Sequence, residues 1–228
     1  MMEHGGITGG IDEAGRGPVI GPLIIGCVVL DENGRKNLKK LNVRDSKKVT
    51  PMRRAYLEPK IKENAIEWTL IEISPKEIDI LRKRHSLNAI EAVKVAEIIL
   101  SLKNIPEIIY LDAVDNNAHD YGNRIINILK SSNKSLDEDF IIPEIVSEHK
   151  ADDRYIEVAA ASILAKVERD RIIRGIRDKY GDFGSGYPSD ERTQVFIRKL
   201  IRDGKLPEFV RRSWNTLNKG KQMRLNEF

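Results

Sequence analysis

The sequence is poor in the residues that build disulfides, zinc sites and membrane spans. It contains one cysteine, Cys27, and four histidines among 228 residues. A single cysteine excludes an intrachain disulfide, and no Cys/His cluster has the spacing of a zinc site. No stretch approaches the roughly 20 apolar residues of a membrane-spanning helix. We therefore expect a cytoplasmic protein with no membrane partner, in which Cys27 is a small buried apolar residue.

Charge is nearly balanced over the whole chain but unevenly distributed along it. The chain carries a net charge of +4, whereas residues 192–228 have ten Lys/Arg against three Asp/Glu, a net charge of +7. A basic tail behind a slightly acidic body favours a polyanionic partner, and a solubilising charged helix is the alternative. The length fits one domain with an appendage.

Apolar runs and turn signals predict an α/β protein. Strands are expected at 19–30, 66–73, 107–112 and 141–146, after a first strand that carries residues 11–14, and residues 31–34 are expected to form a turn. Thr50-Pro51 and Ser74-Pro75 predict helix starts, with the hydroxyl as N-cap. Helices are expected at 51–63, from 75, at 86–102, at 119–130 and at 153–179, and the small residues 159–162 should let the last helix lie close to a sheet. A tight turn and one longer excursion, residues 35–65, join the first three strands and predict an antiparallel meander, and the later strand–helix alternation predicts parallel pairing. The Gly/Pro-rich loop 181–189 predicts a boundary between a catalytic domain, 1–190, and a basic helical extension, 191–228.

Four acidic residues stand at the ends of predicted strands. Asp12 and Glu13 are adjacent in a glycine-rich segment, although acids are poor strand residues. Asp112 ends the strand at 107–112, and Asp152 follows the fifth strand. Acids at the ends of neighbouring strands converge on one crevice, where mutual repulsion favours bound cations. Oxygen ligands suit Mg²⁺ or Mn²⁺, and two such ions can promote phosphodiester hydrolysis.

Each acid also has a structural explanation. Asp152 can be a helix N-cap and nothing more, Asp112 can begin an Asx-turn, and Glu13 can pair with Arg16. The adjacent pair Asp12–Glu13 is harder to explain in this way, because neither capping nor turn chemistry requires it.

Six motifs occur in order over residues 7–190: Asp12–Gly17, Asp45–Lys48, Tyr110–Asp112, His149–Asp152, Ala159–Lys166 and Gly184–Asp190. Together they resemble the ribonuclease HII family, its archaeal members more than the longer eukaryotic ones. A seventh motif, Arg212-Ser213-Trp214, resembles a family element in the tail.

The resemblance implies a ribonuclease-H-like five-stranded mixed sheet flanked by helices, with a C-terminal helical extension. It implies endonucleolytic cleavage of the RNA strand of RNA–DNA hybrids and incision at ribonucleotides embedded in duplex DNA, leaving 5′-phosphate and 3′-hydroxyl ends. A monomer is expected. Carried over by motif, the metal-binding catalytic set is Asp12, Glu13, Asp112 and Asp152.

The resemblance also implies substrate contacts. Gly15-Arg16-Gly17 becomes the sensor of the ribose 2′-hydroxyl, and Tyr187 packs against the neighbouring sugar. A loop anchor is the alternative for Tyr187. Lys47, Lys150, Lys166 and Arg212 are candidate phosphate contacts, and a solvated surface side chain is the alternative for each lysine.

Two other functions stay open from the sequence. One is a different ribonuclease-H-like nuclease, such as ribonuclease HIII or a junction resolvase. The other is a protein that binds hybrids without cleaving them.

Overall fold

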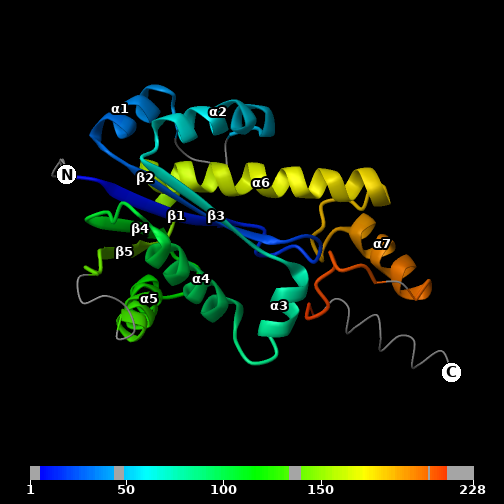
Figure 1. The fold of residues 1–228 in the computed structure, drawn as a ribbon. Helices are drawn as coiled ribbons and strands as arrows, with labels where there is room; N and C mark the ends of the chain where they lie inside the picture. Colours follow the sequence, from blue (N-terminus) through cyan, green and yellow to red (C-terminus); the bar gives the residue numbers. More distant parts are fainter. Residues whose placement is uncertain (1–5, 44–48, 134–139, 205, 215–228) are drawn as a thin grey trace. The chain divides into compact units, whose positions relative to one another are not determined.

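The computed structural model describes residues 6–43, 49–133, 140–204 and 206–214 (Figure 1). Contacts within this part of the chain define two compact units. The first, here called the sheet unit, comprises the described residues within 1–14, 24–71 and 88–167. The second, the helical unit, comprises the described residues within 15–23, 72–87 and 168–228. The domain boundary predicted after residue 190 falls inside the helical unit and stays a prediction.

Five strands form one mixed sheet of order β3-β2-β1-β4-β5. Strand β1 pairs antiparallel with β2 and parallel with β4, and β4 pairs parallel with β5. The predicted mixed sheet and its parallel half are therefore confirmed, and the order of the first three strands is that of a meander. The strands are β1 Thr8–Ala14, β2 Leu23–Leu30, β3 Glu67–Ile73, β4 Ile108–Asp112 and β5 Glu144–Glu148.

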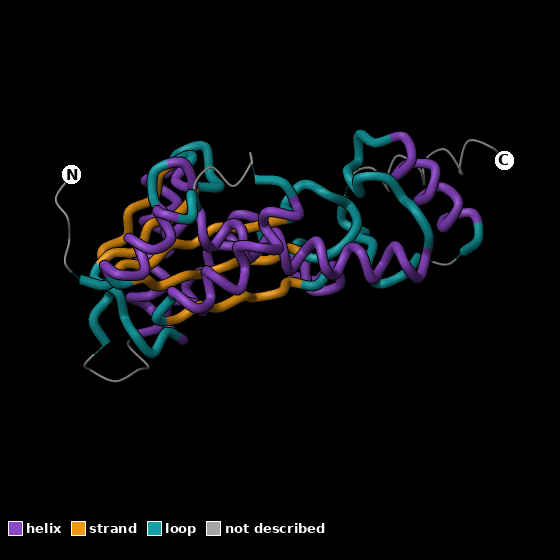
Figure 2. The backbone as a smooth tube through the Cα atoms, turned by 90° about the horizontal axis from the view of Figure 1, so that it is seen from above, coloured by secondary structure: helices purple, strands orange, loops and turns teal. Residues whose placement is uncertain are grey.

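Seven α-helices occur in the described ranges and are drawn in purple in Figure 2. Two begin as predicted at a hydroxyl cap followed by proline: Thr50 accepts from the amide of Arg53, and Ser74 from that of Glu77. Such caps satisfy amides that have no partner within the helix. The helices are α1 Glu32–Lys40, α2 Pro51–Asn64, α3 Pro75–Leu81, α4 Leu87–Ser101, α5 Ala118–Asn133, α6 Ile156–Tyr180 and α7 Glu191–Arg202. None of the described helices meets the length and hydropathy that spanning a membrane requires.

Three local predictions were wrong. Residues 31–34 do not form a turn, because the Asp31 carboxylate accepts from the Gly34 amide at 2.7 Å and caps α1. Asp152 does not open the long helix: it lies in a separate 3₁₀ turn, Ala151–Asp153, and α6 begins only at Ile156. The fifth strand is also displaced, since it ends at Glu148 rather than at residue 146.

Helix α6 packs against the backbone of the sheet. A Cβ on Gly26 would lie 2.7 Å from the carbonyl oxygen of Ala161, and one on Gly10 would overlap the backbone of Glu157 and Val158. Because side chains alternate along a strand, Ile11 and Ile25 point to the opposite face, where they meet α4. The small residues predicted to let this helix lie close to the sheet therefore do so.

The helical unit has a core of its own. Val19 and Ile20, which follow the glycine-rich turn after β1, pack with Phe183, Ile197 and Val210. Ile20 also forms an antiparallel bridge with Val210. The turn after β1 is thus packed against the C-terminal segment.

Candidate active site

Strand pairing brings Asp12 and Asp112 together. Ile11 and Leu111 are partners in the parallel ladder of β1 and β4, and each acid is the next residue of its strand. Asp12 is 6% exposed. Both acids line a cavity of about 10 Å³, which is about the size of one water molecule.

The carboxyl group of Asp12 holds its proton unusually tightly. Burial is the main cause and the negative charge of Asp112 adds to it, so that the pKa rises from 3.8 to about 7. A hydrogen bond from Ser162, the charge of Lys166 and the Glu13 amide, which donates at 2.7 Å, oppose the rise. The two carboxyl groups therefore interact electrostatically, as acids sharing one site must.

Helix α6 contributes a polar pair to this site. The Lys166 ammonium donates to the Ser162 hydroxyl at 2.8 Å, and Ser162 is fully buried. The sequence predicted Lys166 as a phosphate contact and gave Ser162 no role. Because the two residues are one helical turn apart, both lie beside Asp12. The feature of the sequence that could have identified Ser162 is a small polar residue within a run of alanines.

Asp152 is buried and follows a residue that contacts Asp112. The Ala151 amide donates to Asp112 Oδ1 at 3.0 Å, and Asp152 is 2% exposed. Lys150, just before, has a left-handed φ of 57°, which turns the chain from β5 into the 3₁₀ turn. The neighbour of Asp152 is thus hydrogen-bonded to Asp112, whereas Lys150 is exposed.

A further acid lines the cavity of Asp12 and Asp112. Glu91, on α4, is 1% exposed and lines the cavity with Asp12, Glu13 and Asp112. The sequence analysis missed it. The signal was a single carboxylate inside an otherwise apolar helical segment, a placement that burial makes costly.

The donors fit a hard divalent ion. No three His, Cys, Asp or Glu side chains form a ready-made metal centre in the described part of the chain. Mg²⁺ does not need one, because it is commonly held by one or two carboxylates together with waters and substrate phosphates. The cavity offers only oxygen ligands and no thiolate or imidazole, so the residues suit Mg²⁺ or Mn²⁺ rather than zinc.

The glycine turn after β1 meets the predicted sugar contact within the helical unit. Gly15 has a φ of +95°, which L side chains rarely adopt, and a Cβ there would lie 2.6 Å from the Pro22 carbonyl oxygen. A Cβ on Gly17 would lie 2.9 Å from Cε1 of Tyr187. Tyr187 is 47% exposed, so the ring covers the glycine turn and keeps an open face.

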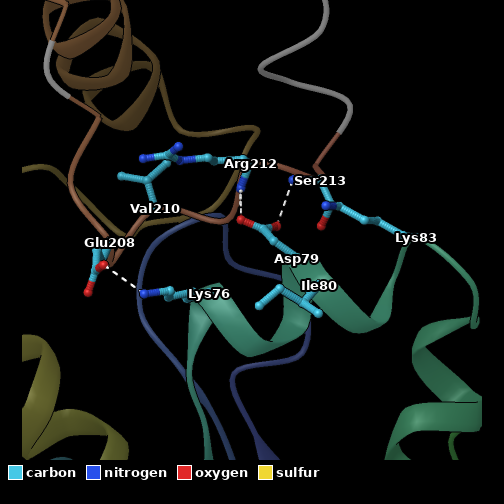
Figure 3. Close-up of a pocket in the computed structure, with 8 residues that line it drawn as sticks. All are labelled: Lys76, Asp79, Ile80, Lys83, Glu208, Val210, Arg212 and Ser213. Carbon is cyan, nitrogen blue, oxygen red and sulfur yellow. Dashed lines mark hydrogen bonds and ion pairs between the residues drawn. The ribbon is translucent and has the colours of Figure 1, made fainter.

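Two further predicted contacts have different positions. Arg212 is exposed and donates to the Leu206 carbonyl at 2.9 Å. It lines a cavity of about 520 Å³ with α3, shown in Figure 3. Lys47 lies outside the described residues.

A five-stranded mixed sheet whose central parallel strands bring two carboxylates together defines a nuclease of ribonuclease-H-like fold. Residues 9–217 match the family model described as Ribonuclease HII. Ribonuclease HII of Thermococcus sibiricus is 45% identical over 212 residues, which are 92% of this chain and 89% of the relative. The chain belongs to the ribonuclease HII family.

Two solved structures of ribonuclease HII relatives are similar to this chain over nearly its whole length. The crystal structure of ribonuclease H2 from Pyrococcus horikoshii is 40% identical and has a TM-score of 0.86, with 97% of this chain and 100% of that one covered. The Archaeoglobus fulgidus ribonuclease HII, solved in a complex with PCNA, is 39% identical with a TM-score of 0.81 and the same coverage. The chain is thus a metal-dependent endoribonuclease of this family, which cleaves the RNA strand of RNA–DNA hybrids and incises at embedded ribonucleotides.

Proposed function

We propose that this chain carries out its cleavage at Asp12, Glu13, Asp112 and Asp152, with Mg²⁺ or Mn²⁺ bound there. The observation that supports this most directly is the meeting of Asp12 and Asp112 at adjoining positions of β1 and β4. Bound ions would supply an activated water and stabilise the leaving 3′-oxygen. Ser162 and Lys166 orient the Asp12 carboxylate, and the Ala151 amide orients that of Asp112.

We further propose that the Gly15–Gly17 turn and Tyr187 read the ribose. The 2′-hydroxyl distinguishes RNA from DNA at one nucleotide, and a glycine backbone can approach it because no Cβ intervenes. The exposed face of Tyr187 is suited to pack on the neighbouring sugar. Lys150 and Arg212, both exposed, are suited to phosphate contacts, which position a duplex without reading its sequence.

The direct test is cleavage of a DNA duplex that contains one ribonucleotide, with Mg²⁺, Mn²⁺ or EDTA. We expect metal-dependent incision by the natural sequence and a loss of at least about a hundredfold in Asp12→Asn. Asp178→Asn, an exposed acid late in α6, is the matched control and should retain full activity. Near-normal cleavage by Asp12→Asn in Mg²⁺ would refute the metal assignment.

The same assay separates the alternatives. A junction resolvase would instead cut a four-way junction, and a non-catalytic binder would hold the hybrid without cutting it in any metal. A preference for Mg²⁺ over Mn²⁺, or the reverse, is read from the initial rates in each ion.

A second proposal concerns assembly. The Archaeoglobus relative was solved in a complex with PCNA and aligns with 97% of this chain. We propose that this chain also binds a PCNA ring while being a monomer by itself. Size-exclusion chromatography with light scattering, with and without PCNA, tests both statements, and an unchanged mass on adding PCNA would refute the assembly.

A further inference from the structure

The C-terminal segment holds the glycine turn through one buried side chain. Arg211 is 0% exposed. Its Nη2 donates to the carbonyl of Gly15 at 2.6 Å, its Nη1 to that of Arg16 at 3.0 Å, and its Nε to that of Gly21 at 2.8 Å. A guanidinium group presents its donors in a rigid planar fork, so these bonds fix the acceptors relative to one another.

Trp214 donates a further hydrogen bond to the glycine turn. Its indole Nε1 donates to the carbonyl of Gly17 at 3.0 Å. The guanidinium carbons of Arg82 and Arg211 lie 5.0 and 4.8 Å from the ring centre, within the range of a cation–π contact. Three successive carbonyls of the turn, those of residues 15, 16 and 17, therefore receive a hydrogen bond from the same short segment.

Helix α3 anchors this segment in turn. The Asp79 carboxylate accepts from the backbone amides of Arg212 at 2.7 Å and Ser213 at 2.8 Å, as Figure 3 shows. Both amides lie between Arg211 and Trp214 in the chain. The two donors to the glycine turn are thus tied to a helix at the residues that separate them.

Holding the carbonyls also directs the amides. In a planar trans peptide the N–H and C=O bonds point in opposite directions. The carbonyls of Gly15 and Arg16 share their peptide units with the amides of Arg16 and Gly17. Both amides consequently point away from Arg211, whereas the peptide after Gly17 has no N–H because residue 18 is proline.

We propose that Arg211 and Trp214 are positioning residues that hold the Gly15–Gly17 turn in the one peptide orientation able to read a ribose 2′-hydroxyl. This inference rests on the proposed role of the turn. It gives the C-terminal segment a part in choosing the sugar, whereas the basic charge of the tail had suggested only a polyanionic partner. Neither residue lines the cavity of Asp12 and Asp112.

The test compares sugar-dependent cleavage with sugar-independent binding. Arg211→Lys keeps the charge but loses the fork, and Trp214→Phe keeps a ring but loses the N–H donor. For each variant, kcat/KM is measured on a duplex with one ribonucleotide. The same duplex made only of DNA then serves as a competitive inhibitor in the same assay, and its Ki reports binding without a 2′-hydroxyl.

We expect kcat/KM to fall about tenfold in each variant, the loss that one misplaced hydrogen bond produces, while the Ki of the all-DNA duplex stays within about twofold. Matched controls make the same substitutions elsewhere. Arg35→Lys alters a guanidinium that donates to the carbonyls of Gly6 and Leu30, and Trp68→Phe alters a ring on β3. Both controls should retain their kcat/KM.

Three results would overturn the proposal. The first is an unchanged kcat/KM in both variants. The second is a fall in kcat/KM accompanied by an equal rise in the Ki of the all-DNA duplex, and the third is an equal fall in the kcat/KM of the controls with their Ki unchanged. If Arg211→Lys does not fold, Trp214→Phe decides alone, because it removes one donor at a half-buried position. Failure of the proposed function is a separate result, since the natural sequence itself would then not cleave the ribonucleotide duplex.

Discussion

The ring of Tyr187 occupies the space that a side chain at Gly17 would need. A Cβ on Gly17 would lie 2.9 Å from Cε1 and 3.5 Å from Cδ1 of that ring. The two residues stand 170 positions apart in the sequence, yet both were predicted as contacts to the sugar. Because they pack together, we expect a substitution at one residue to alter the contribution of the other to cleavage.

Gly17→Ala should displace Tyr187 rather than unfold the protein, because the φ of Gly17 is not left-handed and the ring is half exposed. We expect kcat/KM on the single-ribonucleotide duplex to fall about tenfold, in line with the loss of one aromatic packing contact. The double variant Gly17→Ala/Tyr187→Ala should have nearly the same kcat/KM as Tyr187→Ala alone.

Gly175→Ala is the matched control for this substitution. A Cβ at Gly175, in α6, would have nothing within 4 Å. This variant should cleave normally and melt slightly higher, because alanine favours a helix over glycine. Full additivity of Gly17→Ala and Tyr187→Ala would show that the two residues act separately.

Much of the site was visible in the sequence because strand ends are easy to recognise. An apolar run that ends at Asp112 and an acid pair at Asp12 in a glycine-rich strand predicted where the carboxylates would lie, and the parallel pairing of β1 with β4 then brings the two together. Thr50 and Ser74 were found for a similar reason, since a hydroxyl before proline marks a helix start. In these cases the local pattern and the tertiary structure agree.

The roles of other residues could not be predicted from the sequence, because they depend on whether the side chain is buried and on what it contacts. Arg211 lies in a segment of net positive charge, where any arginine resembles a phosphate contact, yet its three donors point into the protein. Glu91 and Ser162 sit on helices whose patterns indicate only packing. Asp31 opens α1 although the residues after it are typical of turns, because its carboxylate caps the helix.

Cys27 should be inert in the folded protein. It is fully buried on β2, and burial raises the pKa of its thiol to about 12, so that almost no reactive thiolate exists near pH 8. We expect no reaction with a thiol reagent such as DTNB in native buffer and one equivalent in guanidinium chloride. The chain has no other cysteine, so any signal belongs to this residue. Stoichiometric labelling of the native protein within minutes would contradict the buried position.

Asp12 should make the metal-free protein less stable as pH rises. Its folded-state pKa, about 7, lies above the unfolded value near 3.8. The folded state therefore binds the proton more tightly, and this stabilisation is complete below about pH 4 and lost as pH rises through 7. In EDTA, Asp12→Asn should be more stable than the natural sequence at pH 8, by on the order of 1–4 kcal/mol.

Thermal unfolding in EDTA between pH 4 and pH 8 measures this difference. The gap between Asp12→Asn and the natural sequence should open as pH rises, and Mg²⁺ at pH 8 should raise the Tm of the natural sequence more than that of the variant. Asp178→Asn should follow the natural sequence throughout. If the difference in Tm between Asp12→Asn and the natural sequence is as large at pH 4 as at pH 8, ionisation of the Asp12 carboxyl group is not its cause.

Asp190 should stabilise the Tyr187 loop through its charge. Its carboxylate accepts from the amide of Ser185 at 2.6 Å and from that of Arg192 at 2.9 Å, and it caps α7. Hydrogen bonds from the backbone and hydroxyl of Ser185 are the main reason that its pKa falls from 3.8 to about 2. Because the folded-state pKa is depressed, this stabilisation is present above about pH 4 and is lost as pH falls through 2.

Asp190→Asn isolates this charge, since asparagine is itself a good N-cap. We expect a Tm a few degrees lower at pH 7, with the difference shrinking toward pH 3, measured by circular dichroism. Glu191→Gln removes a neighbouring charge from the first turn of the same helix and should change Tm little. Because the loop also carries Tyr187, the variant should raise KM for the single-ribonucleotide duplex more than it lowers kcat. A Tm difference that persists or widens at pH 3 would mean that packing, and not the ionised carboxylate, holds the loop.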